Sequence, residues 1–203
     1  MKIIAIGRNY IDHAKELNNP VPTEPVVFLM PDTCILSNNK PFFYPDFSSD
    51  IHFEVELVLK INRVGKNIKA EFAHRYFDEV TVGIDFTARD LQAKAKAKGL
   101  PWEKAKAFDG SAPIGQFISL SELNDSESIA FSLDINGQRR QTGNSGDMIF
   151  SFNEIIAYVS RFFSLKMGDL IFTGTPAGVG PVTIGDKLEA SIEGQVLLDF
   201  QIK

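Results

Sequence analysis

Apolar and polar residues alternate over short stretches along most of this chain, a pattern typical of β-strands with one face in a core. The clearest example is residues 51–60, IHFEVELVLK. As a strand, this stretch places apolar side chains on one face and Glu54 and Glu56 together on the other, roughly 7 Å apart. The pattern therefore predicts a central strand with two carboxylates side by side.

The same alternation, with runs of β-branched residues, predicts further strands before and after this one. They are expected at residues 2–6, 26–30, 34–36, 42–44, 80–86, 131–135, 138–141, 170–173, 187–192 and 195–202. Asn136-Gly137 is a strong hairpin signal, and Glu193-Gly194 predicts a second hairpin.

Helical spacing of apolar residues is found in fewer places. It predicts helices at residues 8–18 with Asn9 as the cap, at 70–77, at 88–98 with Thr87 as the cap and Gly99 as the end, and at 151–163 with Ser151 or Asn153 as the cap. No repeat, low-complexity tract or linker interrupts the series, so we expect one domain over residues 1–203.

The paired carboxylates are the first candidate for chemistry. Glu54 and Glu56 repel each other unless a positive group lies between them, and a divalent cation with oxygen ligands would serve. A half-solvated acidic strand face is the alternative. Asp85, within the apolar run VTVGIDF, is costly to bury unless it is paired or binds a metal, which makes it the best third oxygen ligand.

A second candidate is the pair His13 and Glu16, three residues apart on the first predicted helix. A carboxylate beside an imidazole orients it and raises its basicity, as a general base requires, although a surface pair on a helix has the same spacing. Three prolines follow within residues 19–25, so we expect residues 9–25 to form a lid over bound substrate.

Two loops add polar groups. In PWEKAKAFDG, Trp102 and Phe108 bracket two lysines, either of which could bind a substrate carboxylate or remain exposed. The glycine-rich turn after residue 173 offers backbone N–H groups for an anion but lacks the spacing of the nucleotide-binding loops.

Composition narrows the class of partner. The net charge is −5 and no dense basic run is present, which argues against nucleic acid and anionic membranes. The single cysteine, Cys34, excludes an internal disulfide, and its apolar setting predicts burial. No apolar run is long enough for a membrane span and the first residues do not resemble a signal peptide, so we expect a cytoplasmic protein.

Five blocks, in order, carry a resemblance to a known family: IGRNYIDHAKE, HFEVELVLKI, GIDFTARDLQ, KGLPWEKAKAFDGSAPIG and MGDLIFTGTPAGVG. Together they resemble the fumarylacetoacetate hydrolase family, and the length is similar to that of its small, acylpyruvase-like members. The resemblance implies a β-rich α+β fold, a rolled mixed β-sheet of the family's C-terminal domain type with a few peripheral helices, in a homodimer.

The resemblance also implies roles for particular residues. The family's metal carboxylates fall on Glu54, Glu56 and Asp85, with Mg²⁺ as the usual ion and Mn²⁺ or Ca²⁺ as possible ones. The catalytic groups fall on His13, Glu16 and Lys106, and the substrate contacts on Arg8, Arg89, Gln92, Gly174 and Thr175. The fourth acidic ligand of the larger fumarylacetoacetases has no counterpart here, which argues against a fumarylacetoacetase proper.

These groups predict divalent-metal-dependent cleavage of small 2-oxo acids through the enolate of pyruvate. An acylpyruvate would be hydrolysed by water that His13 activates, whereas oxaloacetate would lose its distal carboxylate. A tautomerase or isomerase of the 2-hydroxyhepta-2,4-diene-1,7-dioate type is the alternative enzyme. A metal-stabilised binding module is the alternative without catalysis.

Overall fold

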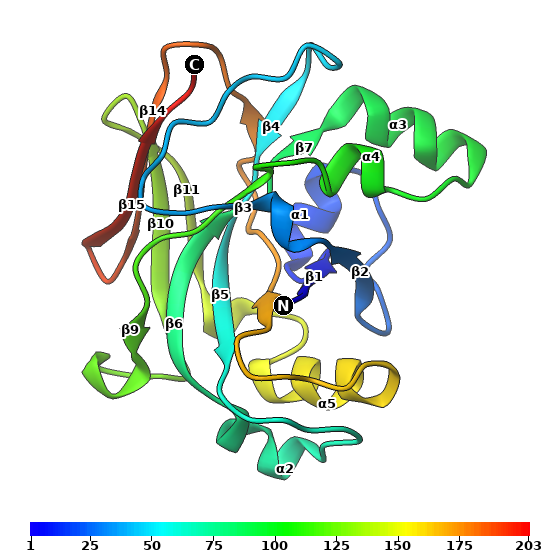
Figure 1. The fold of residues 1–203 in the computed structure, drawn as a ribbon, viewed down its shortest axis with the longest axis vertical. Coiled ribbons are helices and arrows are strands. Elements are labelled where there is room, and N and C mark those ends of the chain that lie inside the picture. The colour runs from blue at the N-terminus through cyan, green and yellow to red at the C-terminus, as the bar shows by residue number, and fades with distance from the viewer.

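Two packed β-sheets with helices outside them make up the molecule (Figure 1). The structure, a computed structural model, describes residues 1–203. The strand-rich, mixed α+β fold expected from the sequence is confirmed.

The larger sheet has six strands and carries the central strand in its interior. Across the sheet they are β2 (Val26–Met30), β1 (Ile3–Gly7), β12 (Leu170–Phe172), β5 (Val55–Ile61), β6 (Phe77–Ile84) and β9 (Ile118–Ser119). Strands β1 and β12 are parallel and the other neighbours are antiparallel, so the sheet is mixed.

The second sheet consists of the two hairpins predicted in the second half of the chain. Its strands, in order, are β11 (Gln138–Asn144), β10 (Ala130–Ile135), β14 (Lys187–Ile192) and β15 (Gln195–Gln201). Smaller ladders join β13 (Gly180–Pro181), β4 (Ile51–Phe53) and β7 (Thr87–Ala88), and pair β3 (Ile35–Leu36) with β8 (Ala112–Pro113).

Five helices lie outside the sheets, with α5 and α2 below β1 and β2 in the view of Figure 1. They are α1 (Ile11–Glu16), α2 (Ala70–Ala73), α3 (Arg89–Lys98), α4 (Glu103–Lys106) and α5 (Phe152–Phe162). Short 3₁₀ turns occupy Asp32–Cys34, His74–Tyr76, Leu120–Glu122 and Ser145–Asp147. The predicted cap of the last helix is present, because Ser151 and Glu154 form a reciprocal capping box. No helix is both long and apolar enough to cross a bilayer.

Two of the predicted caps are wrong. Helix α1 begins after Tyr10 without a side-chain cap, because the Asn9 side chain bonds instead to the backbone of Phe150 and Thr173. Thr87 lies in β7, and its hydroxyl donates to the backbone oxygen of Asp85. Asn9 is therefore engaged in long-range hydrogen bonds, whereas Thr87 forms a local one with the residue two positions before it. Helix α4 lies in a stretch that the sequence indicated to be loop.

The alternation within β5 separates two cores. Val55, Leu57 and Leu59 belong to a cluster of 36 buried residues that lies between the two sheets. Val58, on the opposite face, belongs to a smaller cluster of eight that includes the buried Cys34. Glu56 shares the face of Val58, so the carboxylates lie on the side of the large sheet away from the second sheet.

Candidate metal centre and active site

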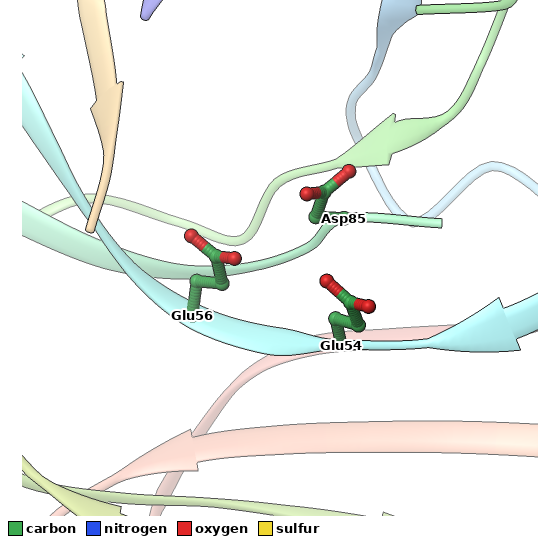
Figure 2. Close-up of side chains that lie close together, drawn as sticks. All are labelled: Glu54, Glu56 and Asp85. Atoms are coloured by element: carbon green, nitrogen blue, oxygen red, sulfur yellow. The ribbon is translucent and has the colours of Figure 1, made fainter. Parts of the chain in front are cut away.

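The three predicted carboxylates meet at one point (Figure 2). Glu54 lies in the break between β4 and β5, Glu56 follows on β5, and Asp85 comes directly after the neighbouring strand β6. The Asp85 N–H donates to the backbone oxygen of Glu54 at 2.8 Å, which brings the two residues side by side. All three are buried, and each offers an oxygen within 4.8 Å of the others. The half-solvated strand face is therefore the wrong alternative.

Two cations compensate part of this negative charge. Lys106 Nζ donates to Glu54 Oε2 at 2.7 Å and to Asp85 Oδ2 at 2.6 Å, and Arg89 donates to Glu54 Oε1 at 2.6 Å. Lys106 is only 3% exposed, and its ammonium lies 5.6 Å from the centre of the Phe28 ring. Its neighbour Lys104 is exposed, so the lysine at the carboxylates is the one that the family resemblance indicated and that the residue pattern alone left open.

Proton affinities within the cluster differ because the cations favour one carboxylate. Burial alone would raise the pKa of Glu54, but Lys106 and Arg89 outweigh burial and hold that pKa below its usual value. Burial raises the pKa of Asp85 to about 6 in spite of Lys106, and burial together with the Asp85 charge raises the pKa of Glu56 well above its usual value. Glu54 and Asp85 each have a cation partner and Glu56 has none, so two cations face three carboxylates and more positive charge can be accommodated.

The donor set fits a hard divalent cation. Three carboxylates supply oxygen ligands of the kind that Mg²⁺, Mn²⁺ and Ca²⁺ prefer. Asp85 Oδ1 is fully buried and has no hydrogen-bond partner in the protein, although buried acceptors are nearly always paired. An unpaired carboxylate oxygen beside two other carboxylates is the arrangement expected of a cation ligand.

The His13–Glu16 pair forms on α1, where residues three apart share a face. His13 Nδ1 lies 3.2 Å from Glu16 Oε2, and Glu16 Oε1 accepts a hydrogen bond from the Gly178 N–H at 3.0 Å. His13 is only 4% exposed, so the surface-pair alternative is wrong. Burial lowers the pKa of His13 below its ordinary value of 6.5, although the charges of Glu54 and Glu16 oppose the shift. Burial therefore favours the neutral form of the imidazole.

Most of the predicted site residues line one cavity. Its lining includes His13, Lys106, Arg8, Arg89, Gln92, Thr175, Glu54, Glu56 and Asp85. Glu16 and Gly174 lie outside the lining, but each bonds to a member of it, Glu16 to His13 and Gly174 to Glu56. The free space between these side chains is about 30 Å³, enough for little more than a water molecule.

The sequence predicted that the glycine-rich turn offers free N–H groups to an anion, but its first N–H group is bonded within the protein. The Gly174 N–H donates to Glu56 Oε2 at 2.7 Å, and the Thr175 hydroxyl oxygen accepts from Gln141 Nε2 at 2.9 Å. Gly174 has φ +104°, and a Cβ there would lie 2.5 Å from the Cβ of Asn9, so only glycine fits.

Lys96, Phe28 and Trp102 are among the residues that line this cavity and to which the sequence assigned no site role. Lys96 could have been found, because Arg89, Gln92 and Lys96 have the i, i+3, i+7 spacing of one helical face. Burial and the nearby charges of Arg8 and Arg89 lower the pKa of Lys96. Phe28 and Trp102 come from separate segments and stack edge to face only in the fold.

Comparison with known proteins agrees with this geometry. A family model described as fumarylacetoacetate (FAA) hydrolase C-terminal matches residues 2–203. The mitochondrial oxaloacetate tautomerase of Mus musculus is 41% identical, over 99% of this chain and 91% of its own length. The mitochondrial oxaloacetate decarboxylase of Dictyostelium discoideum is 43% identical, over 95% and 89%. The crystal structure of a fumarylpyruvate hydrolase from Pseudomonas aeruginosa in complex with Mn²⁺ and pyruvate superposes with a TM-score of 0.94 at 37% identity, covering 100% of this chain and 89% of that one.

Proposed function

The chain belongs to the fumarylacetoacetate hydrolase family, and from that premise we propose that residues 1–203 form one catalytic domain that cleaves small 2-oxo acids through the enolate of pyruvate. One observation carries the proposal. Buried His13, which Glu16 contacts from outside the lining, faces the same cavity as the three carboxylates and the Lys106 ammonium that contacts Glu54 and Asp85.

Glu54, Glu56 and Asp85 are proposed to hold a divalent cation, Mg²⁺ in the first place. When bound, such an ion supplies Lewis acidity to the oxygens of a 2-oxo acid. Arg89 and Lys106 donate hydrogen bonds to Glu54, and Lys106 also donates to Asp85 Oδ2, which holds both carboxylates in place before substrate arrives. Asp85 Oδ1 has no partner in the protein and is left as a ligand atom.

His13 and Glu16 are proposed to act as general base and orienting group. If His13 Nδ1 donates to Glu16, the lone pair of Nε2 is free to accept a proton from water. The water oxygen then attacks the distal carbonyl of an acylpyruvate, and the C–C bond breaks to give a carboxylic acid and the enolate of pyruvate. The Lys106 ammonium stabilises the negative charge that develops on the enolate oxygen.

Tautomerisation of oxaloacetate is the second candidate. It requires only that a base and an acid move one proton between carbon and oxygen, which the same groups can do without a water nucleophile. The names of the mouse and Dictyostelium relatives favour oxaloacetate as a substrate to test, for tautomerisation and for decarboxylation.

The charges at the cavity favour a substrate with two carboxylates. Arg89 and Lys106 are paired with acidic residues, whereas Arg8 and Lys96 form no ion pair in the structure. Two unpaired cations beside the carboxylate cluster attract an anionic group at the end of the substrate away from the cluster. Gly174 and Thr175 remain proposed contacts, with Gln92 placed by its hydrogen bond from Arg89.

Residues 9–25 are proposed to open and close over this cavity. His13, Leu17 and Asn19 of this segment line a space of about 30 Å³, far smaller than a 2-oxo acid, so substrate entry requires part of the wall to move. The segment 17–25 has no regular secondary structure, which makes it the part of the wall that moves most easily.

We also propose a homodimer formed through β2. This strand lies at the edge of the large sheet and borders an apolar groove of about 620 Å³. Leu29, Leu100 and Phe162 are all at least 40% exposed around it. An unpaired strand edge beside exposed apolar side chains is a surface that a second copy covers by a two-fold contact.

Turnover of three reactions tests the function. The protein with Mg²⁺ is incubated with acetylpyruvate or with oxaloacetate, and substrate, acetate, pyruvate and the enol and keto forms are followed by NMR. Acetate and pyruvate in equal amounts establish hydrolysis, pyruvate from oxaloacetate above the background establishes decarboxylation, and faster enol–keto exchange without pyruvate establishes tautomerisation. A protein that accelerates none of these has a different function.

A further inference from the structure

The polar side chain of Gln141 points into the protein, whereas the residues beside it on the same strand face solvent. It lies on β11, where residues 138–140 are exposed and Gln141 itself is only 1% exposed. Its cross-strand partner is the buried Leu133 of β10. An amide at such an inward position is costly to bury unless it is fully hydrogen-bonded, so its bonds indicate what it does there.

All of its hydrogen bonds lead to the candidate active site. Gln141 Oε1 accepts from the Val55 N–H at 2.9 Å, and Val55 lies between Glu54 and Glu56. Gln141 Nε2 donates to Thr175 Oγ1 and to the Pro176 oxygen, both at 2.9 Å. One side chain thus joins the strand that carries two of the carboxylates to the turn that follows β12.

This turn, residues 174–178, connects the two halves of the site. At one end the Gly174 N–H donates to Glu56, and at the other end the Gly178 N–H donates to Glu16. The turn is pressed onto β11, since a Cβ at Gly178 would lie 2.6 Å from the Arg140 oxygen. Gln141 holds the middle of the turn, between these two bonds.

We propose that Gln141 is a positioning residue that fixes the 174–178 turn and so sets the placement of the His13–Glu16 pair relative to the carboxylate cluster. The inference rests on the proposed function of this site. Without Gln141 the turn is free to leave β11, the Gly178 N–H no longer holds Glu16, and the Val55 backbone between the carboxylates loses its partner. Small misplacement of a base relative to its substrate lowers kcat more than it changes KM.

The primary variant is Gln141→Leu, which fills a similar volume and removes all three hydrogen bonds. Gln141→Asn is the second variant, because it keeps an amide that is one methylene too short to reach both Val55 and Pro176. Ser132→Ala is the matched control, since it removes a buried hydrogen bond to Ser191 within the same sheet but has no contact with the turn.

Three readouts are measured on each protein. Hydrogen exchange of peptides that cover residues 174–178, and kcat and KM for whichever substrate the wild type turns over, are measured on the Mg²⁺-loaded protein. Mn²⁺ affinity is measured by calorimetry on the metal-stripped protein. For Gln141→Leu we expect at least ~10-fold faster exchange in the turn, ~10-fold weaker Mn²⁺ binding, and a kcat reduced ~10–100-fold with KM changed less than kcat. Gln141→Asn should give smaller changes of the same sign, and Ser132→Ala should give none.

Unchanged exchange in the turn overturns the proposal, and so does a loss of kcat that Ser132→Ala reproduces. If Gln141→Leu does not fold, Gln141→Asn decides by the same readouts. A wild type without turnover counts against the proposed function alone, because exchange and Mn²⁺ binding still test the role of Gln141.

Discussion

Replacement of Lys106 by methionine removes the cation that lies between two buried carboxylates. The ammonium is 2.7 Å from Glu54 Oε2 and 2.6 Å from Asp85 Oδ2, and almost no solvent reaches it. The variant leaves only the Arg89 guanidinium beside three carboxylates. In metal-free protein the Lys106→Met change should therefore lower stability strongly, and a divalent cation should restore much of the loss.

The size of the loss follows from the buried pairs. Removal of one partner of a buried ion pair typically costs about 3–5 kcal/mol. Asp85 already has a pKa of about 6, so it can take up a proton, and we expect the lower end, about 3 kcal/mol. For a chain of 203 residues this corresponds to a melting temperature lower by roughly 6–12 °C.

Thermal unfolding followed by circular dichroism measures the effect, once in EDTA and once in excess Mg²⁺. Lys104→Met is the control, because Lys104 is an exposed lysine on the same helix. We expect the Mg²⁺-induced rise in melting temperature to be larger in Lys106→Met than in the wild type, since the ion no longer competes with the ammonium. Equal rises in the two proteins, or a loss no greater than that of Lys104→Met, would refute this reasoning.

Three further outcomes are expected. Because neutral His13 is the proposed base and burial lowers its pKa, the acid limb of kcat/KM should have its midpoint below pH 6.5. Glu16→Gln should move that midpoint to still lower pH and reduce kcat about 100-fold. A shift of the midpoint to higher pH would contradict the assignment. Hydrogen exchange in residues 9–25 should slow at least ~10-fold when Mg²⁺ and pyruvate are added, whereas equal exchange with and without them would exclude a lid. Light scattering after gel filtration should give a dimer for the wild type and a monomer for Leu29→Glu; a wild-type monomer, or a dimeric variant, would rule out the β2 interface.

The sequence was sufficient where one physical rule determines local structure. Alternation defined the strands, as in the second-half hairpins, whose turns at Asn136 and Glu193 have the positive φ that those positions require. A charge in an apolar run marked Asp85, because burial of a carboxylate requires a compensating partner.

It was insufficient where distant segments compete for the same group. Asn9 is a good helix cap by propensity, but two tertiary partners 141 and 164 residues away take its side chain. Without the family resemblance, the choice between Lys104 and Lys106 would stay open, because packing determines which side of a four-residue helix faces the carboxylates. The proposed role of Gln141 could not be predicted from the sequence for the same reason, since its three hydrogen-bond partners lie 34 to 86 residues away.

The central claim is that three buried carboxylates hold a divalent cation on which turnover depends. Its most direct test is a titration of metal-stripped protein with Mn²⁺, in which heat of binding and turnover of acetylpyruvate or oxaloacetate are measured on the same samples. We expect one ion bound per chain, turnover that rises in proportion to occupancy, and loss of both in Glu54→Gln. Full turnover in the metal-stripped wild type, or in Glu54→Gln, would contradict the account.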